Sequence, residues 1–411
     1  MHETIFKRHK VLTRFREGPH LKEREYFLEQ CTKEGYSLSM LCKIAWILLS
    51  ISPNLKFSNG KITKNDIEKA VDQRTRFIPS SNYGHGSRQL FISFAIKWLR
   101  NLGFFEERIK EDGPFTAYIN TFSRYLNDER GLSPVTIATR SERLNWFFDY
   151  LEPRIDSLSK ISIIDVDDFL EKKGGNGWGR SSLKSLASSL RSFFRYAEGQ
   201  GWCDPGIADV IESPRVYTRE DLPEGPAWED VRRLLSNTKN DSPADIRNHA
   251  ILMLLAVYGF RRGEVAQLKL DDIDWIGEKI RVSRPKQRKT QCYPLIMEVG
   301  ESILRYLREI RPRSPHRYIF LSLAAPIRPL SPHSISAVAR SRLKAIGVTL
   351  SWQGAHCLRH SCARHLLDSG FSLKEIGDHL GHRTVNSTLN YTKIDISGLR
   401  QVAELDLRGV L

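Results

Sequence analysis

Apolar side chains recur at the spacing of an α-helix through residues 115–200. The pattern predicts three amphipathic helices, and Ser133-Pro134 is a typical start signal for the second of them. Their expected ranges are Phe115–Asn127, Val135–Leu151 and Ser181–Glu198. The sequence therefore predicts a helical unit in this part of the chain.

Beyond this region the pattern changes to helices interrupted by one hairpin. Apolar and basic residues alternate over Lys279–Ser283, Pro285 begins a turn, and Gln291–Leu295 returns. Residues 213–228 carry three prolines and no periodicity, which is typical of a linker or an extended strap. The predicted fold class is mainly α with a small β-hairpin or sheet: a helical domain followed by a mixed α+β domain.

Composition indicates the kind of partner. The chain has 411 residues, with 63 Lys and Arg against 48 Asp and Glu and a net charge of +15. Such an excess attracts nucleic acid through counterion release, although it assigns no chemistry. The N-terminus lacks the apolar core of a signal peptide, the longest apolar run is too short to cross a bilayer, and six cysteines are scattered. We therefore expect a cytoplasmic, nucleoid-associated protein with reduced thiols and no membrane partner.

Two basic surfaces are candidates for contact with DNA. One is the polar side of the predicted Ser181–Glu198 helix, and the other is the hairpin, where six of the twelve residues over Lys279–Thr290 are basic and none is acidic. The alternative for the helix is an ordinary solvated face. The expected DNA contacts are Lys184, Arg191, Arg288 and Lys289.

The first 110 residues carry an internal repeat. Lys33–Ser50 resembles Glu129–Phe148, with Gly131 lying 96 residues after Gly35, and a second matching pair follows at a similar offset. The pattern is consistent with a duplicated helical unit, although unrelated amphipathic helices often look alike. A true duplicate would make this region a second DNA-binding or subunit-contacting arm.

Six separated residues form a set suited to phosphodiester chemistry. Negative charge grows on the phosphate in its transition state, and planar guanidinium groups match its oxygens. A phenol needs a base or a positive field to act as a nucleophile at neutral pH, and the departing sugar oxygen needs a general acid. These roles can be filled by Arg261, Lys286, His356, Arg359, His382 and Tyr391.

The neighbours of these residues support the set. Gly259 should end an apolar helix, and Glu264 could orient the guanidinium of Arg261, although such a segment alone is typical of a surface cap. His356 and Arg359 stand one helical turn apart and can project toward one phosphate.

Further along, Ser372 and Glu375 form a capping-box pattern, and Gly381 should end that helix. His382 would then emerge at a helix terminus, nine residues before Tyr391. A lone tyrosine in a polar segment is ordinarily a surface residue. An ordinary surface tyrosine would seldom follow a glycine-histidine helix end at such a distance, so the spacing favours a functional role for Tyr391.

A zinc site is the alternative for HCLRHSCARH, where five candidate ligands crowd ten residues. Structural zinc sites usually join two ligand pairs from separate elements. The sequence offers no second pair of that kind, so we expect no metal ligands.

The order Arg, Lys, HxxR, GH and Tyr resembles the tyrosine recombinase (phage integrase) family. It is carried by YGFRRGEVAQLKLDDID, RPKQRKTQCYPL, HCLRHSCARHLLDSG and LGHRTVNSTLNYTKI, and residues 115–206 resemble the family's core-binding domain. Two departures exist: the family more often has Thr-Gly-Leu-Arg where this chain has Tyr-Gly-Phe-Arg, and Pro285 stands where a glycine usually flanks the lysine. Lys289 therefore remains a rival for the role of Lys286.

The resemblance implies a mechanism. Tyr391 would attack the scissile phosphate to give a 3′-phosphotyrosyl link, Arg261 and Arg359 would stabilise the charge, and Lys286 would protonate the leaving oxygen. No cofactor or metal would be needed. The expected partners are double-stranded DNA with inverted-repeat half-sites, three further protomers in a synaptic tetramer, and accessory recombinases.

The biological role is an expectation as well. The extra N-terminal residues favour an integrase or transposase of a mobile element over chromosome or plasmid dimer resolution. DNA relaxation by a type IB topoisomerase-like reaction is an alternative that uses the same chemistry.

The expected domains are a helical arm over 1–110, a SAM-like core-binding domain over 111–212, a linker over 213–228 and a catalytic domain over 229–411. The tail Thr392–Leu411 has an apolar stripe too small to form a core. The family resemblance suggests that a neighbouring protomer buries this stripe; the alternative is packing on its own domain.

Overall fold

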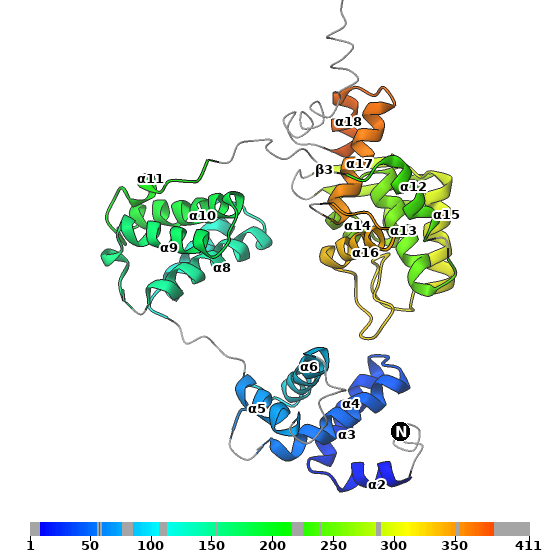
Figure 1. Cartoon of the computed structure of the whole chain (residues 1–411), viewed down its shortest axis with the longest axis horizontal. Coiled ribbons are helices and arrows are strands. Elements are labelled where there is room, and N and C mark those ends of the chain that lie inside the picture. Colours follow the sequence, from blue (N-terminus) through cyan, green and yellow to red (C-terminus); the bar gives the residue numbers. More distant parts are fainter. Residues whose placement is uncertain are drawn as a thin grey trace, which may run out of the picture. The chain divides into compact units, whose positions relative to one another are not determined.

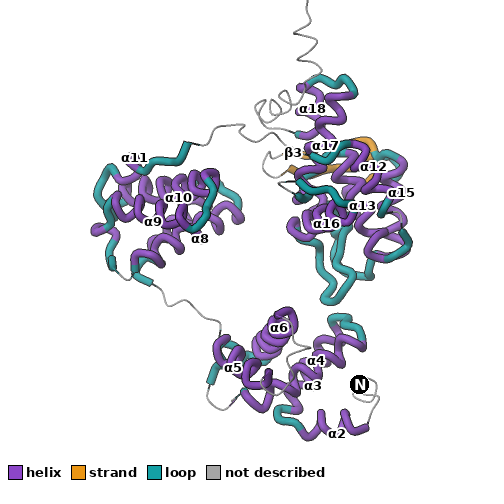
Figure 2. The backbone as a smooth tube through the Cα atoms, viewed as in Figure 1, coloured by secondary structure: helices purple, strands orange, loops and turns teal. Residues whose placement is uncertain are grey.

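A computed structural model shows a mainly helical chain with one small sheet, as the sequence predicts (Figure 1, Figure 2). None of the described helices combines the length and the apolar character needed to cross a bilayer. The structure describes residues 9–55, 57, 60–75, 85–106, 113–152, 154–215, 225–238, 240–284, 289–350 and 353–381.

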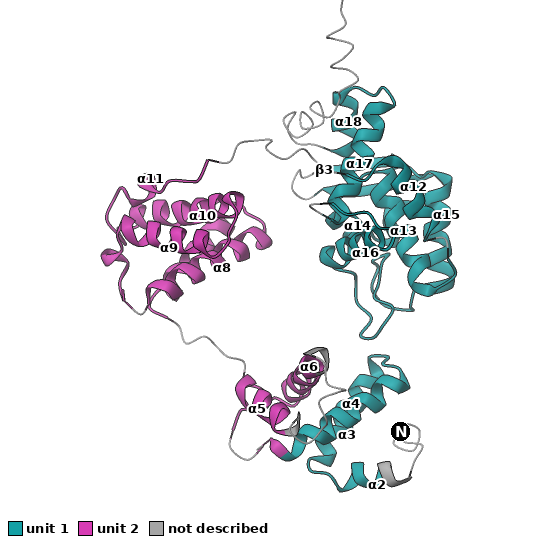
Figure 3. Cartoon of the chain, viewed as in Figure 1, with its two compact units in different colours: residues 1–53, 219–411 teal, residues 54–218 magenta. Residues whose placement is uncertain are grey.

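The chain divides into two compact units, one of residues 1–53 with 219–411 and one of residues 54–218 (Figure 3). The division at 218 falls inside the predicted linker, and the other predicted domain boundaries stay predictions. The second unit contains α5 (Lys64–Thr75), α6 (His85–Asn101), α7 (Thr116–Asp128), α8 (Pro134–Leu151), α9 (Ile163–Gly175), α10 (Arg180–Gly199) and α11 (Ile207–Val210).

The first unit begins with three helices and continues after the linker with the expected mixture of helices and strands. Its elements are α2 (His9–Glu17), α3 (Leu21–Lys33), α4 (Leu38–Ile51), α12 (Trp228–Ser236), α13 (Pro243–Val257), α14 (Arg262–Gln267), β1 (Ile273–Asp274), β2 (Lys279–Arg284), β3 (Lys289–Pro294), α15 (Met297–Arg305), a π-helical turn (Tyr306–Ile310), α16 (Pro332–Ala345), α17 (Ala355–Asp368) and α18 (Leu373–Leu380).

Helices α7, α8 and α10 confirm the three predicted helices to within about one residue at each end. Their apolar faces meet in a core rich in aromatic rings: Phe115 stacks on Phe148 at 4.4 Å between centroids, and Phe122 meets Phe193 edge-on at 5.4 Å. Aromatic pairs at such distances add to the stabilisation that comes from burial alone. This core fixes the positions of the polar faces of α8 and α10.

The suspected internal repeat has a counterpart in local structure. Ser37 caps α4 by accepting a hydrogen bond from the N–H of Met40, as Ser133 caps α8. The preceding glycines, Gly35 and Gly131, both have positive φ, at 83° and 57°. The two helix–turn–helix segments are therefore built alike, while duplication of a whole domain stays a prediction.

In the first unit, α13 is buried on nearly all sides and packs against α15, α16 and α17. Strands β1, β2 and β3 form an antiparallel sheet in that order, in which Arg281 pairs with Cys292 and Arg284 with Lys289. The predicted hairpin is confirmed, but β2 extends one residue further, to Arg284, and β1 was not predicted. Alternate residues of β2 are buried, so Arg284 points inward.

Helices α17 and α18 form a small apolar cluster of their own around Cys362, Ile376 and Leu380. The predicted capping box is confirmed, because the Ser372 N–H donates to Glu375 Oε2 at 2.8 Å and the Glu375 N–H donates to Ser372 Oγ at 3.3 Å. Gly381 ends α18 in the left-handed conformation, at φ 60°.

Gly259 lies two residues after the end of α13, in a turn where its φ is 62°. Substitution of this glycine tests how closely the turn packs against α18. A Cβ atom there would lie 2.6 Å from Leu380 Cδ2, whereas at Gly347, with φ 77°, it would meet nothing within 4 Å. Both alanine variants should lose about 1–2 kcal/mol of unfolding free energy from backbone strain. Gly259→Ala should lose about 1–3 kcal/mol more from overpacking. Urea denaturation of the two variants measures the difference, and equal losses would contradict the close contact.

Candidate active site

Arg261 stands at the start of α14, directly after the Gly259 turn, with 42% of its side chain exposed. Its backbone N–H donates to Glu264 Oε2 at 2.8 Å, and its Nη1 donates to Glu264 Oε1 at 2.8 Å. Its Nη2 donates to the carbonyl oxygen of Gly381 at 3.1 Å. The expectation that Glu264 orients this guanidinium is confirmed. The turn therefore presents a fixed, partly exposed cation at the surface.

Arg359, on α17, is buried and held by backbone carbonyls. Its Nη1 donates to Gly259 O at 2.7 Å and its Nη2 to Leu380 O at 2.6 Å, with 2% of the residue exposed. It therefore joins the Gly259 turn to the end of α18. The sequence did not predict this burial, because the two carbonyl partners, those of Gly259 and Leu380, come together only in the folded unit.

His356 lies one turn before Arg359 on the exposed side of α17, with its ring 4.3 Å from that of His360. The pKa of His356 is lowered from its ordinary value, first by partial removal from water and then by the positive charges of Arg359, Arg261 and Arg262. The structure therefore brings His356, Arg261 and Arg359 into one electrostatic environment. A neutral imidazole in this position can accept a proton.

Four consecutive carbonyl groups at the end of α18 each accept a hydrogen bond from a side chain of another element. Gln291 Nε2 donates to Asp378 O at 2.9 Å, and the Tyr293 hydroxyl donates to His379 O. Burial raises the pKa of Tyr293 to about 12, so this phenol keeps its proton. Arg359 and Arg261 occupy the next two carbonyls, those of Leu380 and Gly381. The end of α18, which directly precedes His382, is thus held by side chains from β3, from α17 and from the start of α14.

The remaining predicted site residues cannot be placed in this way. Lys286, Arg288, His382 and Tyr391 lie outside the described residues, as does the side chain of Lys289. Their assigned roles stay predictions.

Sequence reasoning missed Arg284, which is 3% exposed and reaches Glu264, Gln291 and Tyr293. The alternation of β2 contained the signal, since Arg284 follows Ile280 and Val282 at inward positions. A charged residue in that register indicates a buried partner.

The predicted basic face of α10 is partly occupied by structural contacts. Lys184 is exposed, whereas Arg191 Nη2 donates to Ile211 O and to Ser213 Oγ, the latter at 3.0 Å. Sequence reasoning missed Arg140 and Arg143 on α8, which donate to side chains of α10. The spacing of three residues between these arginines on one helix was the available signal.

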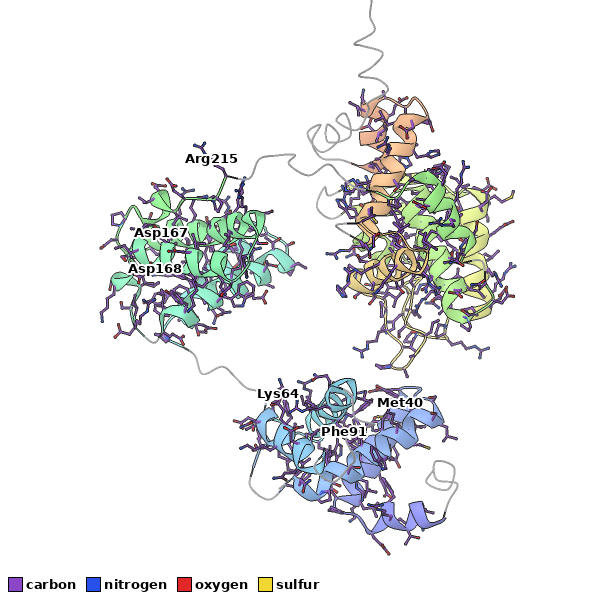
Figure 4. All side chains as sticks on the ribbon, in the orientation of Figure 1. Met40, Lys64, Phe91, Asp167, Asp168 and Arg215 are labelled. Atoms are coloured by element: carbon purple, nitrogen blue, oxygen red, sulfur yellow. The ribbon has the colours of Figure 1, made fainter. Side chains whose placement is uncertain are left out.

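Positive charges lie close together on α8 and just before it. Burial first, and then the charges of Arg130 and Arg143, lower the pKa of Arg140. On α9, by contrast, the exposed residues include Asp167 and Asp168 (Figure 4). The positive charge near α8 thus contrasts with the negative charge of this part of α9.

The cysteines and histidines of α17 face different surroundings. Cys357 Sγ donates to Gly354 O at 2.8 Å within the main core, and Cys362 packs in the cluster with α18, where burial raises its pKa to about 12. His365 stacks on Trp228 at 3.9 Å. Among the described residues, no group of three or more His, Cys, Asp or Glu is placed to hold a metal ion.

Comparison with known proteins adds to this geometry. Residues 227–397 match the model of the phage integrase family, and residues 119–201 match that of the phage integrase N-terminal SAM-like domain. A Sinorhizobium fredii protein named as an integrase/recombinase, y4rA, is 35% identical over 314 residues, covering 75% of this chain and 76% of the relative. Tyrosine recombinase XerD of Mycobacterium tuberculosis is 30% identical over 295 residues, covering 68% and 93%.

A solved structure has a similar fold. The XerH site-specific recombinase, bound to a palindromic difH substrate in a post-cleavage complex, superposes with a TM-score of 0.58 at 18% identity, covering 86% of this chain and 99% of that one. The two family matches, the similarity to y4rA and XerD, and the order of the site residues agree. The chain is a member of the tyrosine recombinase (phage integrase) family, and thus a site-specific recombinase enzyme.

Proposed function

We propose that this protein cleaves and rejoins DNA at specific sites through a 3′-phosphotyrosyl intermediate, as the integrase or transposase of a mobile element. The observation that carries the proposal is that Arg261 and Arg359 both donate to the last carbonyls of α18, and that the charges of these two arginines lower the pKa of His356. Tyr391 follows in the chain ten residues after Gly381. Dimer resolution is the alternative role, because the relatives include XerD as well as y4rA.

Arg261 is suited to bind the scissile phosphate. Each of its Nη atoms donates one hydrogen bond to the protein, and a guanidinium has five N–H groups in all. The partly exposed side chain therefore retains donors for two phosphate oxygens, in the fork geometry that such oxygens match.

The proposed step balances as a transesterification. The phenolic oxygen of Tyr391 forms a bond to phosphorus as the bond from phosphorus to the 5′ oxygen breaks. The phenol proton passes to neutral His356, and Lys286, or its rival Lys289, protonates the departing oxygen. Attack of a 5′-hydroxyl on the phosphotyrosine reverses the step and joins the strands. The energy of the phosphodiester is kept in the protein–DNA bond.

The DNA would be a duplex with inverted-repeat half-sites, bound by four protomers on two sites. Lys184 on α10 and the cationic group of Arg140 and Arg143 on α8 support contact with the phosphate backbone. The tail from Thr392 onward would bind a neighbouring protomer.

The nucleophile can be tested with Tyr391→Phe on a full-site duplex selected from random-sequence DNA by binding. The change removes only the attacking oxygen, so we expect unchanged DNA affinity and no covalent adduct on denaturing gels. The inactive complex would also hold synapsed sites for a count of protomers, which should be four. A persistent adduct would show that another residue attacks.

The general acid can be tested through the leaving group. A 5′-bridging sulfur departs as a stable thiolate and hardly needs a proton. Lys286→Ala should therefore be slow on normal DNA, by about 100-fold or more, and recover on the sulfur-substituted strand. Lys289→Ala is the matched control, and recovery of that variant in place of Lys286→Ala would move the role to Lys289.

The role of His356 predicts a pH dependence. Because its pKa lies below the ordinary 6.5, the neutral form needed to accept a proton should persist to more acidic pH, and the cleavage rate should fall only below pH 6.5. Arg262→Gln removes one of the charges that lower this pKa, so the acid limb of the profile should move up toward 6.5. Arg313→Gln, at an exposed arginine, is the control. An acid limb that lies above pH 6.5 in the wild type would contradict the assignment of His356.

A further inference from the structure

Arg284 is a buried cation that the β2 strand does not require for its own packing. It is 3% exposed at the last position of β2, where the alternation of the strand calls for an apolar side chain. Burying a guanidinium is costly unless charge and hydrogen bonds compensate. Its Nη1 donates to Gln291 Oε1 at 2.6 Å, its Nη2 donates to the Tyr293 hydroxyl, and its Nε lies 3.2 Å from Glu264 Oε1.

Arg284 and Arg261 share one carboxylate oxygen. Glu264 Oε1 lies 2.8 Å from Arg261 Nη1 and 3.2 Å from Arg284 Nε, and the Glu264 side chain is 7% exposed. Without Arg284, the single negative charge of Glu264 would neutralise Arg261. With it, the group of three carries a net positive charge, so Arg261 stays attractive to an anion while its orientation is fixed.

Arg284 also lies directly against the end of α18. A Cβ atom built on Gly381 would stand 1.0 Å from Arg284 Nη1 and 2.1 Å from its Cζ, so a side chain at this position would displace the guanidinium of Arg284. The carbonyl oxygen of the same Gly381 accepts from Arg261 Nη2. Gln291 and Tyr293 accept hydrogen bonds from Arg284. The same two side chains also donate to the carbonyls of Asp378 and His379. Arg284 thus contacts both anchors of Arg261, the carboxylate and the glycine.

We propose that Arg284 is a positioning residue for strand cleavage: it offsets the charge of Glu264 and supports Gly381, and so holds Arg261 oriented and electrostatically available to the scissile phosphate. The inference rests on the proposed role of Arg261 as the phosphate clamp. Arg284 itself touches no reacting atom in this account.

The experiment compares Arg284→Gln with Arg342→Gln in the full-length protein. Arg342 forms an ion pair with Asp245 away from this cluster, so its loss reports on general destabilisation of the same unit. Single-turnover formation of the covalent adduct is measured on a selected full-site duplex with either a normal scissile phosphate or an uncharged methylphosphonate in its place. The neutral substrate develops less negative charge and has less need of a cationic clamp.

On the normal phosphate, Arg284→Gln should be slower than wild type by about 100-fold, the loss typical of one oriented donor at a developing charge. On the methylphosphonate the loss should shrink below about 10-fold. In an Arg261→Ala background, Arg284→Gln should add little, because the two changes remove one function. Arg342→Gln should affect both substrates alike.

Equal losses on the two substrates, a rate like that of wild type, or an additive loss with Arg261→Ala would overturn the positioning role. Arg284→Lys keeps the charge but cannot make all three contacts, and it covers the case in which Arg284→Gln does not fold. It should be partly active with the same relief on the neutral substrate; equal loss on both substrates would again overturn the inference. If wild type forms no adduct, or Arg261→Ala cleaves phosphate normally, the proposed function fails instead.

Discussion

The end of helix α18 is the constraint on which the rest of the site depends. The last carbonyls of a helix have no partner within it and carry partial negative charge. Here the carbonyls from Asp378 to Gly381 are each taken by a side chain from the sheet, from α17 or from the start of α14. Three elements far apart in sequence are thereby held at the end of α18. Gly381, the last of these four residues, directly precedes the segment that contains the expected nucleophile, Tyr391.

Two glycines make this convergence sterically possible. Gly259 and Gly381 both adopt positive φ, and a Cβ atom on either would collide with a neighbour, Leu380 in one case and Arg284 in the other. Each glycine also offers its carbonyl oxygen to an arginine, Arg359 or Arg261. The same residues therefore permit close backbone approach and orient the cations.

Charge is distributed unevenly in this cluster. Arg284 and Arg359 are buried, and Arg261 is partly exposed. Glu264 pairs with Arg261 and with Arg284. An excess of buried positive charge is costly in water-free surroundings, and a bound phosphate would relieve it. The arrangement is thus consistent with the proposed binding of the scissile phosphate.

Local periodicity and short motifs were enough to predict the helices of residues 115–200, the hairpin, the capping box of α18 and the family. Local spacing paired Arg261 with Glu264 within YGFRRGE and His356 with Arg359 within HCLRH, and the resemblance to the family placed the two segments in one site. Three features became visible only in the folded chain: the burial of Arg359, the contact of both Arg261 and Arg284 with Glu264, and the hydrogen bonds from Arg140 and Arg143 that join α8 to α10. Those outcomes depend on which helix end meets which strand, and the pairing of Arg284 with Gly381 spans 97 residues of chain. Periodicity within one element carries no information about such a contact.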